Sequence, residues 1–129
     1  MSHYAIAKVR IQPDVRLLKE VLEGVASKLG AKLRERTVVR GWRLMRNVDF
    51  LVEMDLPYGN GYGVEITRNG IRVHVDDHGA PMTAREFANM IAKEYVTRAL
   101  KNVLEEEGYA VNVEEGKEEN VIYAYEVGI

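Results

Sequence analysis

The chain has 129 residues, of which 47% are hydrophobic and 29% are charged, and its formal net charge is −2. These values are typical of an ordinary soluble protein, and we expect one domain over residues 1–129. The slightly acidic balance predicts no general attraction to nucleic acid or to an anionic membrane. Because cysteine is absent, disulfide bonds, cysteine nucleophiles and thiolate metal sites are excluded.

The apolar segments also predict a location. None approaches the roughly 20 residues that a membrane-spanning helix needs, and the N-terminal residues do not form a signal-peptide core. We therefore expect a cytoplasmic protein without membrane contact. Glutamine occurs only at Gln12, whereas Glu, Lys and Arg are plentiful, a composition typical of thermophiles.

The N-terminal segment predicts a strand and then a helix. Residues 4–11 alternate between the two faces of a strand. Pro13 and Asp14 favour the start of a helix, and Gly30 is suited to its end. One apolar stripe along this helix comprises Val15, Leu18, Leu22, Val25 and Leu29.

Complementary charges predict a hairpin between residues 33–40 and 49–56. The predicted register sets Arg40 opposite Asp49, Arg36 opposite Glu53 and Arg34 opposite Asp55. On the other face it sets Val39 opposite Phe50, Thr37 opposite Val52 and Leu33 opposite Leu56. These ion pairs would neutralise much of the charge of the six cations between Lys32 and Arg46.

Turn and cap signals place the remaining elements. Asn69-Gly70 between two alternating runs predicts a hairpin, whose core face should comprise Tyr62, Val64, Ile66, Ile71, Val73 and Val75. Thr83 and Glu86 form a capping box for a long second helix that ends at Gly108. Residues 109–113 and 121–127 predict a final hairpin.

The elements therefore follow the order strand, helix, four strands, helix, two strands. Hairpin connections favour a mostly antiparallel sheet, and two amphipathic helices should be packed on one of its faces. The predicted fold class is a single α+β domain.

Two sets of polar residues are candidates for chemistry. His74, Asp76 and His78 have the side-chain types of a divalent metal site, but their spacing matches no established motif. We favour a polar strand end and turn there, and predict no metal and no cofactor. The outer-face carboxylates Asp49, Glu53, Asp55 and Glu65 could act as acids or bases, but arginine partners would keep them ionised.

Gly59-Asn60-Gly61-Tyr62-Gly63 only superficially resembles a phosphate-binding loop. Such loops join a strand to a helix, whereas this segment lies between two predicted strands. We interpret the glycines as part of hairpin geometry.

The loop after the first hairpin strand is the best candidate for an interaction site. It contains Trp42, Arg43, Leu44, Met45 and Arg46, and tryptophan, methionine and arginine are enriched at protein interfaces. The same cations and aromatic ring could stack on a nucleotide base. Alternatively, the loop folds under a helix and buries Trp42. Glutamates make the C-terminal end negative, and the middle of the chain is positive. Such asymmetry is usual for a solvated surface, and it could also support head-to-tail association or docking on a basic partner.

Short motifs in a fixed order resemble a known family. They are Met1-Ser2-His3-Tyr4, Val39-Arg40-Gly41-Trp42-Arg43, Val48-Asp49, Gly61-Tyr62, Arg68-Asn69-Gly70, Glu86-Phe87 with Tyr95, and Gly108-Tyr109 with Val111. Together they resemble the conserved chloroplast reading-frame family of cyanobacteria and plastids, which carries domain of unknown function 1257. The resemblance departs after Asp76, where Asp77-His78 replaces the family's paired aromatics. It implies a small soluble protein and assigns no catalytic residue.

We therefore expect a non-enzymatic protein–protein interaction module, either a homodimer or a subunit of a larger assembly. The alternative is an RNA-binding or ribosome-associated protein that uses the basic segment Lys32–Arg46. A further alternative is a metal-dependent enzyme at His74, Asp76 and His78.

Overall fold

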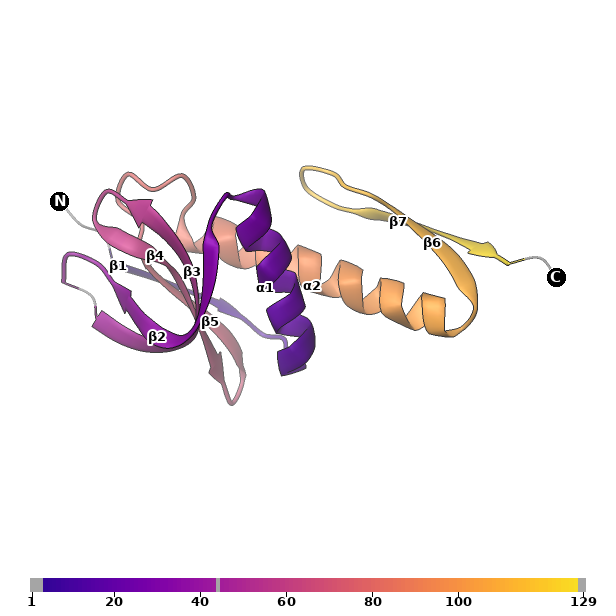
Figure 1. Ribbon diagram of the computed structural model, residues 1–129, viewed down its shortest axis with the longest axis horizontal. Coiled ribbons are helices and arrows are strands. Elements are labelled where there is room, and N and C mark those ends of the chain that lie inside the picture. Colours follow the sequence, from indigo (N-terminus) through magenta and orange to yellow (C-terminus); the bar gives the residue numbers. More distant parts are fainter. Residues whose placement is uncertain (1–3, 44, 128–129) are drawn as a thin grey trace. The chain divides into compact units, whose positions relative to one another are not determined.

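The structure is a computed structural model that describes residues 4–43 and 45–127 (Figure 1). Its elements are β1 (Tyr4–Val9), α1 (Val15–Lys28), β2 (Lys32–Arg40), β3 (Met45–Leu56), β4 (Gly59–Thr67), β5 (Gly70–Asp76), α2 (Ala84–Glu106), β6 (Tyr109–Glu114) and β7 (Val121–Glu126). This order and the α+β class confirm the prediction. No helix in these described ranges is long and apolar enough to span a membrane.

The chain divides into two compact units, which are described separately. Unit 1 is Met1–Ala92 and unit 2 is Lys93–Ile129, so α2 begins in unit 1 and ends in unit 2. The expected single-domain organisation stays a prediction.

Unit 1 contains a five-stranded sheet in the order β1-β5-β4-β3-β2, and every neighbouring pair is antiparallel. The β4–β5 hairpin has the predicted pairing, with Val64 opposite Val73 and Ile66 opposite Ile71. Since side chains alternate across a strand, these residues share the inner face with buried Tyr62.

Both helices contribute to covering this inner face. Asp14 caps α1 by accepting the Leu17 N–H at 3.0 Å, and Leu18, Leu22 and Val25 are buried as predicted. The prediction that Val15 belongs to the apolar stripe is wrong, because Val15 is exposed. Val21 and Ala26 are buried on this face as well. The buried face of α1 is thus rotated slightly around the helix axis relative to the predicted stripe.

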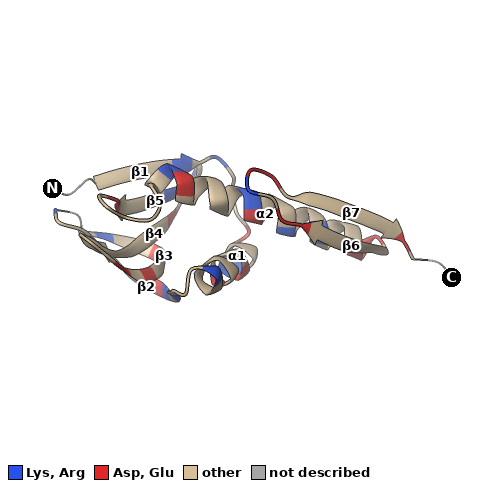
Figure 2. Ribbon diagram, turned by 90° about the horizontal axis from the view of Figure 1, so that it is seen from above, with Lys and Arg blue, Asp and Glu red and all other residues tan. Residues whose placement is uncertain are grey.

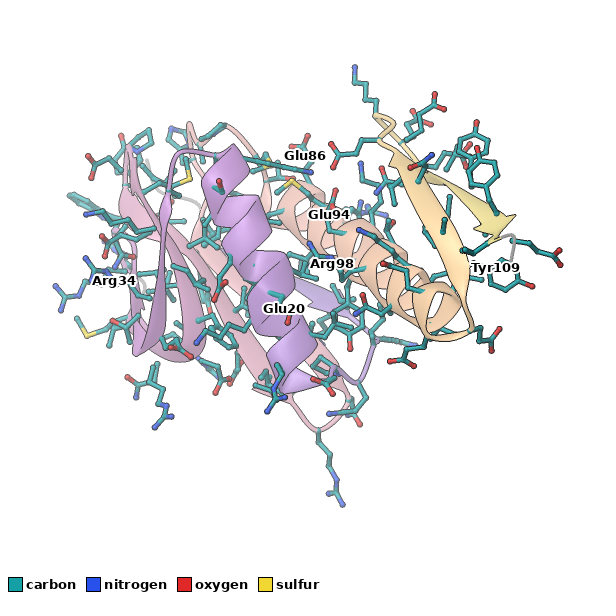
Figure 3. All side chains as sticks on the ribbon, turned by 45° about the vertical axis from the view of Figure 1, so that its right-hand side comes forward. Glu20, Arg34, Glu86, Glu94, Arg98 and Tyr109 are labelled. Atoms are coloured by element: carbon teal, nitrogen blue, oxygen red, sulfur yellow. The ribbon has the colours of Figure 1, made fainter. Side chains whose placement is uncertain are left out.

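The start of α2 is fixed by the predicted capping box. Thr83 accepts the Glu86 N–H at 3.1 Å, and Glu86 (Figure 3) accepts the Thr83 N–H at 3.0 Å. The ring of the next residue, Phe87, stacks on the ring of Tyr62 in β4, with ring centroids 4.3 Å apart. The Tyr62 hydroxyl donates to the Met82 carbonyl at 2.7 Å. Burial of the phenol raises the pKa of Tyr62, although this hydrogen bond opposes the rise.

The predicted register of the β2–β3 hairpin is wrong by four residues. Arg40 pairs with Met45 instead of Asp49, Arg34 with Leu51 instead of Asp55, and Leu33 with Val52 instead of Leu56. The prediction assigned Gly41–Val48 to the loop, but β3 begins at Met45, so the connection is shorter and the ladder closes earlier. Because four is an even number, odd-numbered residues of β2 still pair with even-numbered residues of β3, as predicted.

Arg36 and Val39 also lie differently from the prediction. Arg36 has no partner in the β2–β3 ladder, and its φ of 47° interrupts the extended strand. Beyond this point Val39 pairs with Arg46, not with Phe50. Val39 is buried in a small cluster with Val48 and Leu51.

Glycines on β4 explain where this cluster forms. Gly63 pairs with Leu51 and His74, so it lies on the outer face, opposite the helices. A Cβ at Gly63 would lie 2.8 Å from Val39 Cβ and from Val48 Cγ1. The distal half of the β2–β3 hairpin therefore lies over the outer face of β4, in space that a side chain would fill.

Asn60 fixes the same overlap through its amide. Its Oδ1 accepts the Arg40 N–H at 2.7 Å, and its Nδ2 donates to the Val38 carbonyl at 3.0 Å. Next to it, a Cβ at Gly59 would lie 2.6 Å from the Arg40 carbonyl oxygen. The glycine-rich segment is thus a docking strip for β2.

Unit 2 combines the end of α2 with the antiparallel β6–β7 hairpin. Lys93 donates to the Gly116 carbonyl at 2.9 Å, and Asn120 donates to the Thr97 hydroxyl at 3.0 Å, so the hairpin loop is tied to the helix. On β7, Tyr123 and Tyr125 are about half exposed. Acidic residues gather in the β6–β7 loop (Figure 2).

Candidate functional site

The loop that follows β2 is held against the end of β5. Asp76 is buried, and its carboxylate accepts the Trp42 N–H at 2.9 Å. At the preceding residue, a Cβ on Gly41 would lie 2.5 Å from the Asp76 Cβ, so only glycine fits without a shift. The position of the Trp42 backbone is thus set by β5.

The Trp42 ring nevertheless remains exposed. Trp42 is 66% exposed, so the alternative in which the loop folds under a helix and buries this ring is wrong. The ring meets Tyr58 edge to face at 6.3 Å, and Tyr58 meets His78 in the same way at 5.3 Å. Three separate loops therefore contribute to one aromatic cluster.

We name the surface formed by Trp42, Arg43, Met45, Tyr58 and His78 the tip surface. Met45 is 73% exposed, and Arg43 is exposed. Leu44, which was predicted to belong to this site, lies outside the described residues. The predicted loop residues are thus joined by Tyr58 and His78, which sequence reasoning did not assign to it.

Arg46, which was predicted to belong to the interaction loop, instead forms an ion pair within the sheet. Its guanidinium donates to both carboxylate oxygens of Glu65, at 3.0 and 3.4 Å. The hydrogen bond and the charge of Glu65 raise the pKa of Arg46. Arg46 therefore ties β3 to β4.

The six cations between Lys32 and Arg46 are neutralised less than predicted. Arg34 forms an ion pair as well as Arg46, and its partner is Glu53 at 3.2 Å instead of Asp55. Asp49, the predicted partner of Arg40, instead accepts the Ile66 N–H at 2.7 Å. Within the described ranges, no ion pair involves Lys32, Arg36, Arg40 or Arg43.

The three metal candidates do not converge. His74 is buried with both ring nitrogens engaged, Asp76 binds the Trp42 N–H, and His78 lies against Tyr58. No group of three or more His, Asp or Glu side chains among the residues placed by the structure could hold a metal ion. The arrangement gives no support to the metal-dependent enzyme.

His74 instead belongs to a hydrogen-bonded network on the outer sheet face. Its Nε2 lies 2.8 Å from Glu65 Oε1, and its Nδ1 lies 3.0 Å from the Tyr4 hydroxyl. With the Arg46–Glu65 pair, the network joins β1, β5, β4 and β3. Both polar atoms of a fully buried imidazole are thereby satisfied.

The charge on Glu65 decides the direction of its hydrogen bond with His74. Partial burial opposes ionisation, but hydrogen bonds from His74 and Arg46 outweigh it and lower the pKa of Glu65. An ionised carboxylate only accepts, so the His74 Nε2 donates the hydrogen bond to Glu65. The network thereby fixes four strands of the sheet to one another.

The sequence identifies two residues of this network, Glu65 and His74, but not the hydrogen bonds that connect them to each other and to Tyr4. The sequence predicts an arginine partner for Glu65 and makes His74 a candidate ligand, but it gives Tyr4 no role beyond its place in a strand. The proximity of Tyr4 to His74 depends on the pairing of β1 with β5, which is a long-range contact.

Comparison of the chain with protein-family models, curated proteins and solved structures found no match. The function is therefore inferred from the residues themselves.

Proposed function

We propose that this chain is a non-enzymatic protein–protein interaction module that binds its partner through the tip surface. The observation that carries the proposal is the combination of a fixed backbone and an exposed ring at Trp42. Tryptophan supplies a large apolar area and an N–H donor, and it is among the residues that dominate interface energies. A ring on a fixed backbone loses less conformational freedom when it binds.

We infer that the partner is a second copy of the chain. Unit 1 contains 14 Lys and Arg residues and 11 Asp and Glu residues, so its formal net charge is +3. Unit 2 contains 4 Lys and Arg residues and 9 Asp and Glu residues, so its formal net charge is −5. Arg40 and Arg43 flank Trp42, and Tyr123 and Tyr125 are exposed in the acidic unit. A twofold dimer in which each tip surface contacts unit 2 of the other copy would combine opposite charges and cover these aromatic rings.

RNA binding is the alternative use of the same surface. Its support is the exposed tryptophan together with four cations of Lys32–Arg46 that form no ion pair in the described ranges. The negative unit 2 and the net charge of −2 oppose it, because they repel a polyanion. We therefore favour the protein partner.

The Trp42→Ala variant tests the proposal. We expect the wild type to sediment as a dimer and the variant as a monomer, since the ring is lost from the interface. The melting temperature of the isolated monomer should change by only about 2 °C, because surface substitutions alter stability by about 0.5 kcal/mol. Sedimentation velocity and thermal melts measure both effects.

Val15→Ala is the matched control, because Val15 is an exposed apolar residue on α1 outside the tip surface. It should leave the sedimentation coefficient unchanged. A wild type that remains monomeric at all concentrations would contradict the homodimer. Binding of single-stranded RNA that weakens steeply with salt and requires Trp42 would instead support the RNA-binding alternative.

A further inference from the structure

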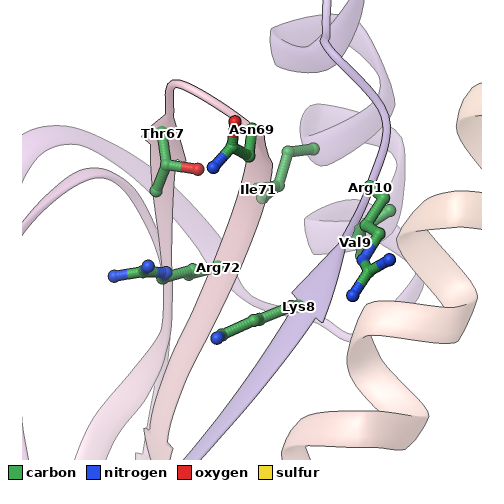
Figure 4. Close-up of a pocket in the computed structure, with 7 residues that line it drawn as sticks. All are labelled: Lys8, Val9, Arg10, Thr67, Asn69, Ile71 and Arg72. Atoms are coloured by element: carbon green, nitrogen blue, oxygen red, sulfur yellow. The ribbon is translucent and has the colours of Figure 1, made fainter.

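A basic cavity lies at the opposite end of β4 from the tip surface. Its volume is about 350 Å³, and it is formed where the end of β1 meets the β4–β5 hairpin (Figure 4). Three of its lining residues are the cations Lys8, Arg10 and Arg72, and none of the described lining residues is acidic. All the lining residues belong to unit 1.

The β1–β5 register brings two of these cations together. Lys8 lies directly opposite Arg72, and like charges in this position destabilise an antiparallel pair. On its other side Arg72 lies opposite Glu65, but that carboxylate binds His74 and Arg46. Within residues 4–43 and 45–127, none of the three cavity cations forms an ion pair.

The cavity also offers neutral groups for a ligand. Asn69 lies in the tight turn between β4 and β5, and its carboxamide can donate two hydrogen bonds. The neighbouring Thr67 hydroxyl donates to the Gly70 carbonyl at 3.1 Å, so Thr67 is committed to the turn. The donors around the cavity are therefore two guanidinium groups, one ammonium group and one amide.

We propose that this cavity binds a compact, multiply charged anion of the phosphate or pyrophosphate type. The planar guanidinium groups of Arg10 and Arg72 suit paired phosphate oxygens, and Lys8 adds a point charge. The volume lies within the range of small-molecule sites and is sufficient for pyrophosphate or a small organic phosphate. Bound anion would neutralise the charges that Lys8 and Arg72 present to each other.

Titration calorimetry of the full chain with sodium pyrophosphate tests the site. We expect the wild type to bind with one-to-one stoichiometry, and Lys8→Gln and Arg72→Gln each to weaken binding at least about tenfold. Arg68→Gln is the matched control, because Arg68 lies in the same turn and is exposed but does not line the cavity. Its affinity should change less than about twofold.

A second titration uses a single-stranded RNA oligonucleotide without terminal phosphates. Pyrophosphate binding without RNA binding identifies a free phosphate compound as the source of the anion. Binding of RNA that is lost in Arg72→Gln and kept in Arg68→Gln identifies the phosphates of a nucleic acid. The proposal is overturned when neither probe binds, or when Arg68→Gln loses as much affinity as Arg72→Gln, since the attraction is then diffuse.

Thermal melts without anion separate a binding role from a structural one. Lys8→Gln removes a repulsion, so its melting temperature should equal or exceed that of the wild type. Pyrophosphate should raise the melting temperature of the wild type and have little effect on this variant. A variant that melts lower than the wild type and responds equally to pyrophosphate would show that Lys8 serves only the fold.

Discussion

Replacing Gly63 with alanine should weaken both the fold and the presentation of Trp42. The added Cβ would lie 2.8 Å from Val39 Cβ and from Val48 Cγ1, closer than carbon atoms normally approach. The Val39 Cβ moves only with its backbone, which belongs to β2, and the Val48 side chain is buried. The β2–β3 hairpin must therefore shift from the outer face of β4, and the Trp42 loop at its end must move with it.

The expected cost is that of overpacking a closed site, about 1–3 kcal/mol. A domain of this size loses about 4 °C of melting temperature for each kcal/mol, so the melting temperature should fall by about 4–12 °C. Trp42 is the only tryptophan in the chain, so its fluorescence reports the tip surface alone. We expect the emission maximum or its quenching by acrylamide to change in Gly63→Ala.

Gly24→Ala provides the matched control, because it makes the same chemical change inside α1, where a Cβ would meet nothing within 4 Å. Alanine favours a helix over glycine by about 0.5–1 kcal/mol, so this variant should melt slightly higher and keep the wild-type fluorescence. The interpretation of the glycine strip is refuted when Gly63→Ala melts at or above the wild-type temperature, or when it destabilises the chain while Trp42 fluorescence is unchanged.

Two further predictions concern ion pairs. Because the folded pKa of Glu65 is lowered, its ionisation stabilises the fold above the ordinary carboxyl pKa of about 4.3, and this contribution is lost as the pH falls through the folded value. Glu65→Gln should therefore be less stable than the wild type by about 1 kcal/mol at pH 7, and the difference in melting temperature should vanish in acid; a difference independent of pH would contradict this. The exposed Arg34–Glu53 pair should show a coupling of only about 0.2–1 kcal/mol in a double-mutant cycle, decreasing in 1 M salt, and a larger coupling that resists salt would contradict the surface geometry.

Elements defined by neighbouring residues could be predicted from the sequence. The capping box at Thr83 and Glu86 acts over three residues, and the short turn before Gly70 brings adjacent runs into a hairpin. The cap at Asp14 is equally local. In each case the side chain and its partner lie within one turn of the chain, so tertiary contacts were not needed to identify the structure.

The β2–β3 register shows where such reasoning fails. Charge matching selected a register with the wrong offset, because exposed ion pairs contribute too little energy to select one alignment. The register follows instead from the short connection between β2 and β3, and the offset is the same on both sides of Arg36. Arg34 still reaches Glu53, which lies diagonally across the ladder, since long side chains span that distance.

The candidate sites depended on contacts between residues far apart in sequence. Sequence alone indicated that Trp42 and its neighbours suit an interface, but the long-range bond to Asp76 and the glycine strip of β4 decided that the ring is held in place and exposed. Likewise, the Lys8–Arg72 juxtaposition exists only because β1 pairs with β5, more than 60 residues later in the chain. Local pattern determined which segments became helices and strands, and the packing of those segments decided which charges and rings came to share a surface.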